Sequence, residues 1–338
     1  MRPIPIATDI EIRMPRSGRK GHDMQKIVIT RFWTGDAYKR LEGKYAVDYD
    51  PEQIDGLERA ALMEKMRDAD AVISMGDEID REMIEAASKL KVIADMWWGG
   101  RVDREAAKER GVQVITHHQG MEWLHNAEVE HLFMQVLAVN RRLREADAFV
   151  RAGKFVRMEQ ANREMLGIGL KGHMLGILGG TGWTGAKIVR RANAFEMNTV
   201  YWDHGARSEE MEALGAKSVS LEELLACSDD IMLVVQHERR RGYFLDRAQF
   251  EMMKPGVVIA NVTDGDLINE KELVRAIREG RVRGAGLDKL EHIYTPVEGL
   301  TDLISVVLTP HSDGAIYSAR AALFEDLVSG VEKVLAGG

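Results

Sequence analysis

The sequence predicts an α/β protein with two lobes, each built on a parallel β-sheet. Apolar runs alternate with amphipathic stretches from residue 26 onward, and this alternation pauses near residue 123 and resumes at residue 174. Strands that alternate with helices pair in parallel through right-handed crossovers. The chain has 338 residues, whereas a single hydrophobic core usually stops growing at about 250–300 residues. The alternation and the length together favour two lobes.

The first series of elements is predicted for the residues before 117. Its strands are short runs of β-branched and small apolar residues, such as KIVIT and AVISM, and its helices carry apolar residues three and four positions apart. Residues 1–25 are polar and contain several arginines, so we expect either a disordered extension or an arm that embraces a second subunit. The expected strands are 26–30, 71–75, 91–96 and 112–116, and the expected helices are 55–69, 80–90 and 103–111.

A long amphipathic segment separates this series from the second one. Residues 123–153 keep a helical period throughout, which predicts one long helix as a spine between the lobes. The last amphipathic segment, 315–338, is expected to fold back on the first lobe, so the predicted domains are 26–125 with 314–338, and 126–313. The second series has expected strands at 174–178, 198–202, 230–235, 256–262, 283–287 and 305–308, and expected helices at 183–195, 221–227, 246–253 and 269–279.

The amino-acid composition limits the kinds of molecule that the protein is expected to bind. A formal net charge of −8 argues against a surface for nucleic acid or anionic membranes. No segment has the ~18 consecutive apolar residues of a membrane span, and the N-terminal residues lack the apolar core of a signal peptide. The single cysteine, Cys227, excludes an internal disulfide and fits a reducing compartment. We therefore expect a cytoplasmic protein that acts on a small molecule. The histidines show no H-x-x-H spacing, and no metal site is predicted.

A glycine-rich loop lies between a predicted strand and a predicted helix. In the pattern G-x-G-x-x-G, the first glycine permits a tight turn, the second lets the backbone approach a pyrophosphate, and the third lets the helix pack on the strand. Asp203 ends the next predicted strand, eighteen residues after Gly185. A carboxylate there accepts hydrogen bonds from the adenosine ribose and repels a 2′-phosphate, so NAD is predicted rather than NADP. The predicted cofactor-binding residues here are Gly180, Thr181, Gly182, Trp183, Thr184, Gly185, Asp203 and His204.

Several longer motifs resemble those of the NAD-dependent D-isomer-specific 2-hydroxyacid dehydrogenases. They are LKVIADMWWGG, RRLREADAFVRAGKF, LGILGGTGWTG, SLEELLACSD, the segment from MKPGVVIANVTDGD to GAGLD, and VVLTPH, and the similarity runs from about residue 26 to the C-terminus. The resemblance implies two Rossmann-like lobes, one flavodoxin-like and one NAD-binding, with the active site in the cleft between them. It also implies a homodimer.

The resemblance places a catalytic histidine at His311, in the T-P-H motif. Histidine suits an acid/base for a hydroxyl proton, because its ordinary pKa lies near neutrality. The family's arginine in N-x-x-R-G is absent, since the aligned residue is Asp264. A substrate carboxylate ~4 Å from Asp264 would be repelled by about 4 kcal/mol at an effective dielectric of ~20. The sequence therefore predicts a substrate pocket that differs from the family's. If Asp264 only caps a turn with Gly265, the family's arginine is still absent.

The glutamate that orients the family's histidine has no clear counterpart. Counting forward from Asp288 reaches Ile293, and counting back from His311 reaches His292. Glu291 is close enough to serve after a backbone shift. A further possibility is that Asp264 pairs with His311 and restores a carboxylate–histidine dyad.

The resemblance implies further residues that bind the substrate or the cofactor. The loop at Ser74, Met75 and Gly76 and the loop at Trp97, Trp98 and Gly99 are expected to bind substrate, and the tryptophans suggest either a bulky, flat substrate or packing between the lobes. The remaining cofactor-binding residues implied by the resemblance are Val235, Gln236, Val262, Thr263 and Asp288.

The sequence favours an NAD-dependent oxidoreductase that transfers a hydride to or from an alcohol or carbonyl carbon. Two alternatives stay open. One is a lyase or isomerase that oxidises its substrate transiently and then returns the hydride. The other is a sensor or scaffold that binds NAD(H) without catalysis, because fold resemblance alone does not settle function.

Overall fold

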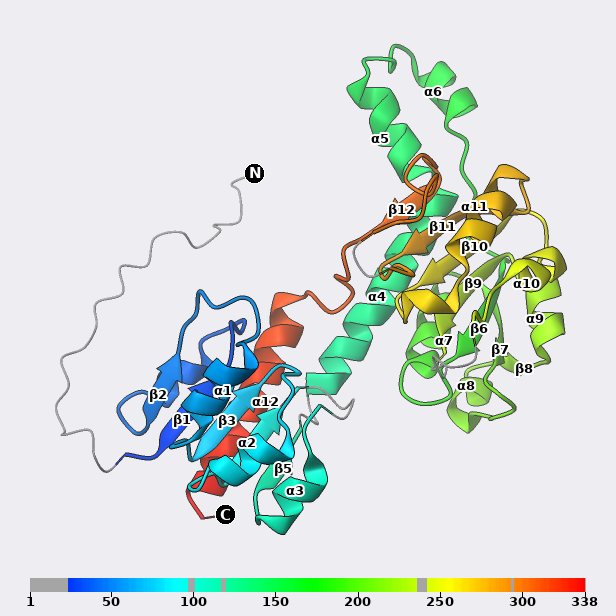
Figure 1. Cartoon of the computed structure of the whole chain (residues 1–338). Helices are drawn as coiled ribbons and strands as arrows, with labels where there is room; N and C mark the ends of the chain where they lie inside the picture. The colour runs from blue at the N-terminus through cyan, green and yellow to red at the C-terminus, as the bar shows by residue number, and fades with distance from the viewer. Residues whose placement is uncertain (1–23, 97–100, 117–119, 236–241, 293–294, 338) are drawn as a thin grey trace. The chain divides into compact units, whose positions relative to one another are not determined.

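The computed structural model describes residues 24–96, 101–116, 120–235, 242–292 and 295–337 (Figure 1). The chain divides into two compact units, each with its own parallel sheet. Unit 1 comprises Met1–His117 with Phe324–Gly338, and unit 2 comprises His118–Leu323. The predicted α/β class with two parallel-sheet lobes is confirmed.

Unit 1 contains a five-stranded sheet in the order β2-β1-β3-β4-β5, with every neighbouring pair parallel. The three central strands are buried, because they read as continuous apolar runs. The edge strand β2 was not predicted, since its residues are mixed in polarity and partly exposed. The elements are β1 (Lys26–Ile29), η1 (Ala37–Arg40), β2 (Ala46–Tyr49), α1 (Arg59–Met66), β3 (Ala71–Ser74), α2 (Arg81–Ala86), β4 (Val92–Asp95), α3 (Arg104–Glu109) and β5 (Gln113–Ile115).

Unit 2 contains a seven-stranded parallel sheet in the order β12-β11-β10-β9-β6-β7-β8. Two apolar clusters cover its two faces, and α4 packs against β10 and β11. The strands are β6 (Met174–Gly179), β7 (Asn198–Trp202), β8 (Lys217–Ser218), β9 (Asp230–Val234), β10 (Val257–Asn261), β11 (Val282–Leu287) and β12 (Val306–Leu308). The helices are α4 (Gly120–Asn140), α5 (Leu143–Arg151), α6 (Met158–Glu164), α7 (Gly185–Ala194), α8 (Glu209–Ala213), α9 (Leu221–Cys227), α10 (Arg247–Met252), η3 (Gly265–Leu267) and α11 (Glu270–Arg278).

The predicted helix over 123–153 is wrong as a single helix. It ends at Asn140, and α5 begins after Arg142, whose backbone is left-handed with φ 52° and ψ 43°. The returning chain stabilises this break, because the Ile168 amide donates to the Asn140 carbonyl at 2.9 Å and Arg142 Nη1 donates to the Glu164 carbonyl at 2.8 Å. Helical periodicity continues across the break, so the sequence pattern alone does not reveal it.

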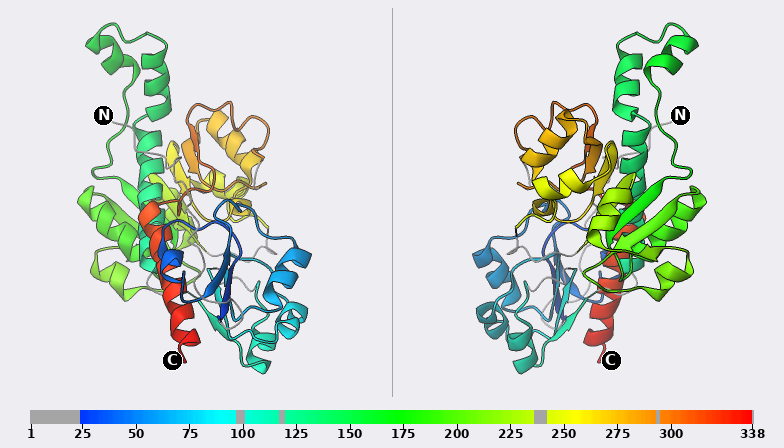
Figure 2. Two further views of the ribbon diagram at one scale, coloured as in Figure 1. Left: turned by 90° about the vertical axis from the view of Figure 1, so that its left-hand side faces the viewer. Right: turned by 90° about the vertical axis from the view of Figure 1, so that its right-hand side faces the viewer.

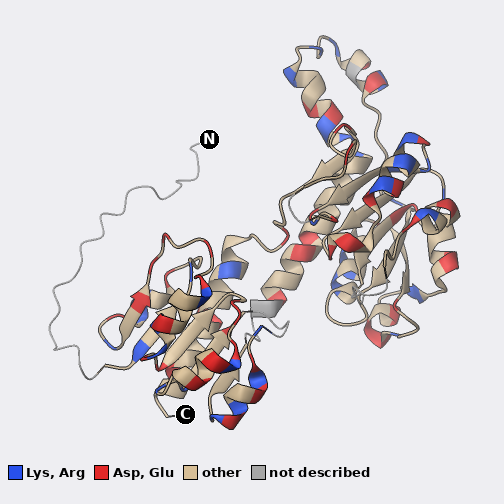
Figure 3. Ribbon diagram, in the orientation of Figure 1, with Lys and Arg blue, Asp and Glu red and all other residues tan. Residues whose placement is uncertain are grey.

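Helices α5 and α6 extend beyond the sheet of unit 2 (Figures 1 and 2). The last helix, α12 (Tyr317–Leu335), begins in unit 2 and ends in unit 1, where Phe324 stacks on Trp33 at 5.1 Å. Basic and acidic residues are interspersed along the ribbons of both units (Figure 3). None of the described helices is long and apolar enough to cross a bilayer.

Candidate active site

The glycine loop joins β6 to α7 at the carboxyl edge of the seven-stranded sheet. Gly180 has φ 84°, a conformation that residues with a side chain rarely adopt. A Cβ on Gly185 would collide with the Gly180 carbonyl oxygen and would lie 2.6 Å from Met211 Sδ, so the helix packs too closely for any other residue. A Cβ on Gly182 would meet open space. The turn therefore leaves an open approach to the N-terminus of α7, where a diphosphate binds favourably.

A hollow of about 370 Å³ lies beside this turn. Asp203 follows β7, and its Oδ2 accepts hydrogen bonds from the amide of Thr181, at 3.0 Å, and from the Thr181 hydroxyl. The carboxylate is thus fixed at the rim where an adenosine ribose would lie, and these residues fit a dinucleotide. The hollow is lined by His125, Gly180, Thr181, Gly182, Trp183, Thr184, Asp203 and Val234.

The next strand ends contribute the other predicted cofactor residues of unit 2. Val235 directly follows β9 and Val262 directly follows β10, and both side chains are buried. The Asn261 side chain shapes the turn that follows β10, because its Oδ1 accepts from the amide of Thr263 at 2.9 Å and from the Thr263 hydroxyl at 2.7 Å. His204 has φ 47° and its ring lies 4.6 Å from that of Trp202. Gln236, Trp97, Trp98 and Gly99 lie outside the described residues.

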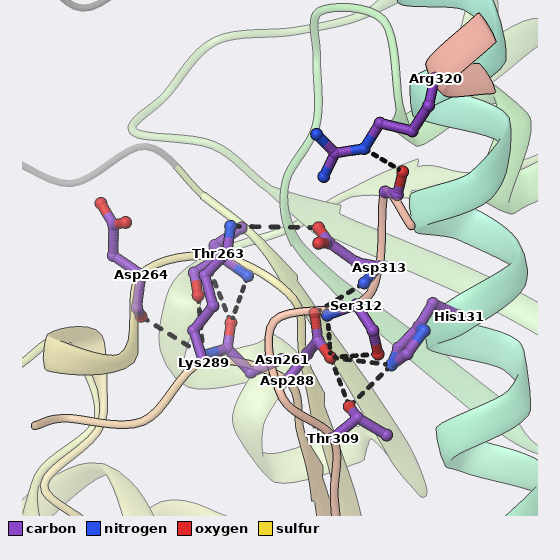
Figure 4. A network of polar contacts seen from close by, with 11 residues as sticks. His131, Asn261, Thr263, Asp264, Asp288, Lys289, Thr309, Ser312, Asp313 and Arg320 are labelled. Carbon is purple, nitrogen blue, oxygen red and sulfur yellow. Dashed lines mark hydrogen bonds and ion pairs between the residues drawn. The ribbon is translucent and has the colours of Figure 1, made fainter. Parts of the chain in front are cut away.

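Asp288, directly after β11, organises the turn that carries His311 (Figure 4). Its side chain is fully buried, and Oδ1 accepts from the Ser312 amide at 3.0 Å and from the Thr309 hydroxyl. Oδ2 accepts from the Asp313 amide at 2.9 Å, and His131 Nε2 from α4 lies 3.2 Å from Oδ1. Burial alone would raise the pKa of Asp288, but the hydrogen bonds from His131, Thr309 and the backbone hold it well below its ordinary value.

His311 follows β12 and has a left-handed backbone with φ 54°. Its amide donates to the Asp288 carbonyl at 2.8 Å, so the backbone bonds of Asp288 fix the residue in this strained conformation. Partial burial lowers the pKa of His311, and the Lys289 ammonium lowers it further, while the carboxylates of Asp313 and Asp288 act in the opposite direction. The imidazole is therefore largely neutral at pH 7 and ready to accept a proton.

The predicted partners of His311 make other contacts. The two Glu291 carboxylate oxygens accept from Tyr243 Oη at 2.5 Å and from the amide of Glu270, the first residue of α11, at 3.2 Å. The His292 side chain is 66% exposed and lies 3.9 Å from Glu291. The Asp264 carbonyl accepts from Asn261, whereas its carboxylate lies apart from the Asp288 network (Figure 4). The Glu291 carboxylate is thus engaged by Tyr243 and the start of α11, and the pairing of Asp264 with His311 stays a prediction.

Four polar residues near His311 were not predicted as site residues. His131 and Glu128 lie on α4, three residues apart and hence on one helix face, while Lys289 follows Asp288 and Asp313 follows Ser312. Burial and the Asp313 carboxylate raise the pKa of Glu128 to about 7, although the Lys289 ammonium lowers it. Polar residues in the otherwise apolar stretch EVEHLFMQV were the available signal for the α4 pair.

The first predicted substrate loop follows β3 in unit 1. Ser74 is buried, and its hydroxyl donates to Asp95 Oδ1 at 2.9 Å. The Gly76 amide donates to the same oxygen at 2.9 Å, and the Gly76 carbonyl accepts from Arg101 Nη1 at 3.1 Å. Met75 lies between them and is partly buried. This loop is thus held at the carboxyl edge of the five-stranded sheet by carboxylate contacts of its own.

Comparisons with known proteins match both parts of the chain to one enzyme family. The NAD-binding domain of the D-isomer specific 2-hydroxyacid dehydrogenases matches residues 133–312, and the catalytic domain of the same family matches residues 36–122. A glyoxylate reductase of Thermococcus litoralis is 36% identical over 306 residues, which cover 89% of this chain and 90% of the relative.

Two solved structures show the same fold over nearly the whole chain. The TT0316 protein of Thermus thermophilus has a TM-score of 0.81 at 31% identity, covering 93% of this chain and 97% of that one. A glyoxylate reductase from Paecilomyes thermophila has a TM-score of 0.74 at 28% identity, covering 92% and 95%.

The chain belongs to the D-isomer specific 2-hydroxyacid dehydrogenase family. It is an NAD-dependent dehydrogenase or reductase that acts on CH–OH groups. The predicted resemblance, class of enzyme and cofactor are confirmed. The individual site residues stay predictions.

Proposed function

We propose that this enzyme transfers a hydride between NAD and the carbonyl or hydroxyl carbon of a small substrate, with His311 as the acid/base and a substrate pocket that departs from the family's pattern. The observation that carries this proposal is the anchoring of His311. The His311 amide donates to the Asp288 carbonyl. The Asp288 carboxylate also accepts from the amides of Ser312 and Asp313, the two residues after His311. Such anchoring holds an acid/base in the geometry that proton transfer requires.

The residues divide the chemistry between them. NAD, when bound, supplies or accepts the hydride. The backbone of Gly180–Gly185 would hold its diphosphate, and the Asp203 carboxylate would hold its adenosine ribose. During reduction, the imidazolium of His311 donates a proton to the carbonyl oxygen as the carbon receives the hydride; during oxidation, the neutral imidazole accepts the hydroxyl proton.

The proposed difference in the pocket rests on Asp264. The family's arginine would attract a substrate carboxylate, whereas a carboxylate at this position repels it. We infer that the substrate does not present its carboxylate to Asp264. The relatives named glyoxylate reductase make glyoxylate the first substrate to assay. They do not favour the alternatives of transient-oxidation chemistry or of a non-catalytic sensor.

A substitution at Asp264 tests the rebuilt pocket. Asp264→Asn removes a negative charge that repels the substrate carboxylate at longer range even when the carboxylate is turned away from it. We expect the KM for glyoxylate to fall about 10-fold, which corresponds to ~1.4 kcal/mol of relieved repulsion. NADH oxidation at saturating NADH measures it. The matched control is Asp266→Asn, two residues further along η3. An unchanged KM in Asp264→Asn would show that Asp264 does not face the substrate and only caps the turn.

We also propose a homodimer, held by the outer surface of α4, α5 and α6. Phe133, Met134, Leu137, Leu143 and Phe195 line an apolar hollow of about 530 Å³. The segment between α5 and α6 exposes Phe155 by 56% and Val156 by 74%, and exposed apolar patches mark protein interfaces. We also propose that the enzyme is cytoplasmic, because its single cysteine fits a reducing compartment.

The dimer is testable by light scattering of the purified protein after gel filtration. We expect twice the mass of one chain for the native protein, and one chain for Val156→Glu, because a buried unpaired carboxylate opposes association. The exposed control Ile54→Glu in unit 1 should leave the mass unchanged. A native protein that elutes with the mass of one chain would refute the proposal.

A further inference from the structure

Asp264, which occupies the position of the family's arginine after β10, lies beside the end of β11. Strands β10 and β11 are parallel, with Asn261 opposite Leu287, so residues 263–265 and 289–291 leave the sheet side by side. The contact is close, because a Cβ on Gly265 would collide with the backbone carbonyl of Leu290. A cation at the end of β11 would therefore lie next to the position that Asp264 occupies.

Lys289 is such a cation. Its ammonium points away from the strand end toward Asp313, whose Oδ2 lies 3.9 Å from Nζ (Figure 4). This distance exceeds that of a hydrogen bond, so the pairing holds the ammonium in place electrostatically without consuming its N–H donors. The Lys289 side chain is 25% exposed and the Asp313 side chain 8% exposed. The ammonium is thus partly desolvated and still accessible to a small anion.

The ammonium also lies close to the proposed acid/base. Lys289 lowers the pKa of His311 more than Arg320 does, and it also acts on the pKa of Glu128. In a 2-oxo acid, the carboxylate and the reacting carbonyl are on adjacent carbons. A group that binds the carboxylate must therefore lie within a few ångströms of the group that protonates the carbonyl oxygen. Lys289 and His311 follow adjacent strands, β11 and β12, and the Lys289 charge acts on the His311 imidazole, so the two groups are placed to satisfy this requirement.

We propose that Lys289 binds the carboxylate of the substrate in place of the absent arginine, and that Asp313 is a positioning residue that holds the ammonium. This inference rests on the proposed function. It places the substrate with its carboxylate turned toward β11 and away from Asp264. An ammonium is a point charge without the two-pronged geometry of a guanidinium, so it accepts an anion in more than one orientation.

A pair of substrates that differ in one charge tests the proposal. Glyoxylate and its neutral amide, glyoxylamide, present the same aldehyde to the enzyme. In Lys289→Met, we expect kcat/KM for glyoxylate to fall about 10- to 100-fold, mainly through KM, because a charge-assisted contact is lost. Turnover of glyoxylamide should change less than about 3-fold. Lys289→Arg should recover part of the glyoxylate activity, and Asp313→Asn should raise the KM for glyoxylate more than it changes kcat.

The controls separate the possible failures. Lys254→Met removes an exposed lysine that pairs with Asp229 at the opposite, amino edge of the sheet, and it should leave both substrates unaffected. An equal loss on glyoxylate and glyoxylamide, or no loss, would overturn the role of Lys289. A carboxylate-selective loss in Arg320→Met but not in Lys289→Met would also overturn it. If the native enzyme reduces neither aldehyde with NADH, the proposed function itself fails, independently of Lys289.

Discussion

Replacing His311 with asparagine is expected to lower kcat/KM by about 10²- to 10⁴-fold, the usual contribution of a general acid/base. Asparagine retains hydrogen bonding and tolerates the left-handed backbone at this position, so the turn after β12 should persist. Because His311 lies apart from the glycine loop in the chain and binds Asp288 through its backbone, the affinity for NADH should be unchanged. Steady-state kinetics together with NADH fluorescence titration measure both quantities.

His292→Asn supplies the comparison for this prediction. The His292 side chain is mostly exposed and adjacent to Glu291, and counting back from His311 places His292 at the position of the family's glutamate. A large loss in His292→Asn, with little change in His311→Asn, would reverse the assignment of the acid/base.

The pH profile should follow the direction of the pKa shift at His311. Reduction requires the imidazolium, and the pKa of His311 lies below its ordinary value of 6.5 because of partial burial and the Lys289 charge. The rate of reduction should therefore decline as pH rises through a value below 6.5, and the rate of oxidation should rise through the same value. In His311→Asn, the residual rates of reduction and of oxidation should no longer change with pH in this range.

The elements that were predicted correctly are those determined by residues close to them in the sequence. The strand–glycine loop–helix unit is specified by glycines whose Cβ atoms would collide with the backbone, as at Gly185. The strand at 198–202 and the helix at 221–227 have the predicted bounds, since a Ser220 cap that accepts from the Glu223 amide at 3.1 Å marks the helix start. The break at Arg142 depends instead on a chain segment that returns more than twenty residues later.

The candidate site was only partly predictable for the same reason. His311 and Asp264 are found by their motifs, but the residue that positions a histidine is decided by three-dimensional neighbours. Glu291 is near the expected place in the sequence, yet it binds Tyr243 and the first amide of α11. Asp313 and Lys289 have no motif of their own, and only the fold of the turn around Asp288 brings them to His311.

Replacing Asp288 with alanine is expected to reduce the free energy of unfolding by about 3–5 kcal/mol, because several buried donors lose their acceptor at a cost of ~1–3 kcal/mol each. The carboxylate is fully buried, and its removal leaves the amides of Ser312 and Asp313 and the Thr309 hydroxyl without their acceptor. Urea unfolding at pH 7 measures the loss, with Asp302→Ala, at an exposed residue, as the matched control.

The pH dependence of this loss has a definite sign. The pKa of Asp288 in the folded protein lies below its ordinary value of 3.8, so the unfolded chain takes up the proton first as the pH falls. The stabilisation is fully present above pH 3.8 and is lost only below it, as the pH falls toward the folded pKa. The difference in unfolding free energy between the native protein and Asp288→Asn should therefore be constant from about pH 5 to pH 8 and shrink in more acidic buffer. A loss below about 1 kcal/mol in Asp288→Ala at pH 7 would show that the turn bearing His311 is held by other contacts, and the anchoring argument for His311 would fall with it.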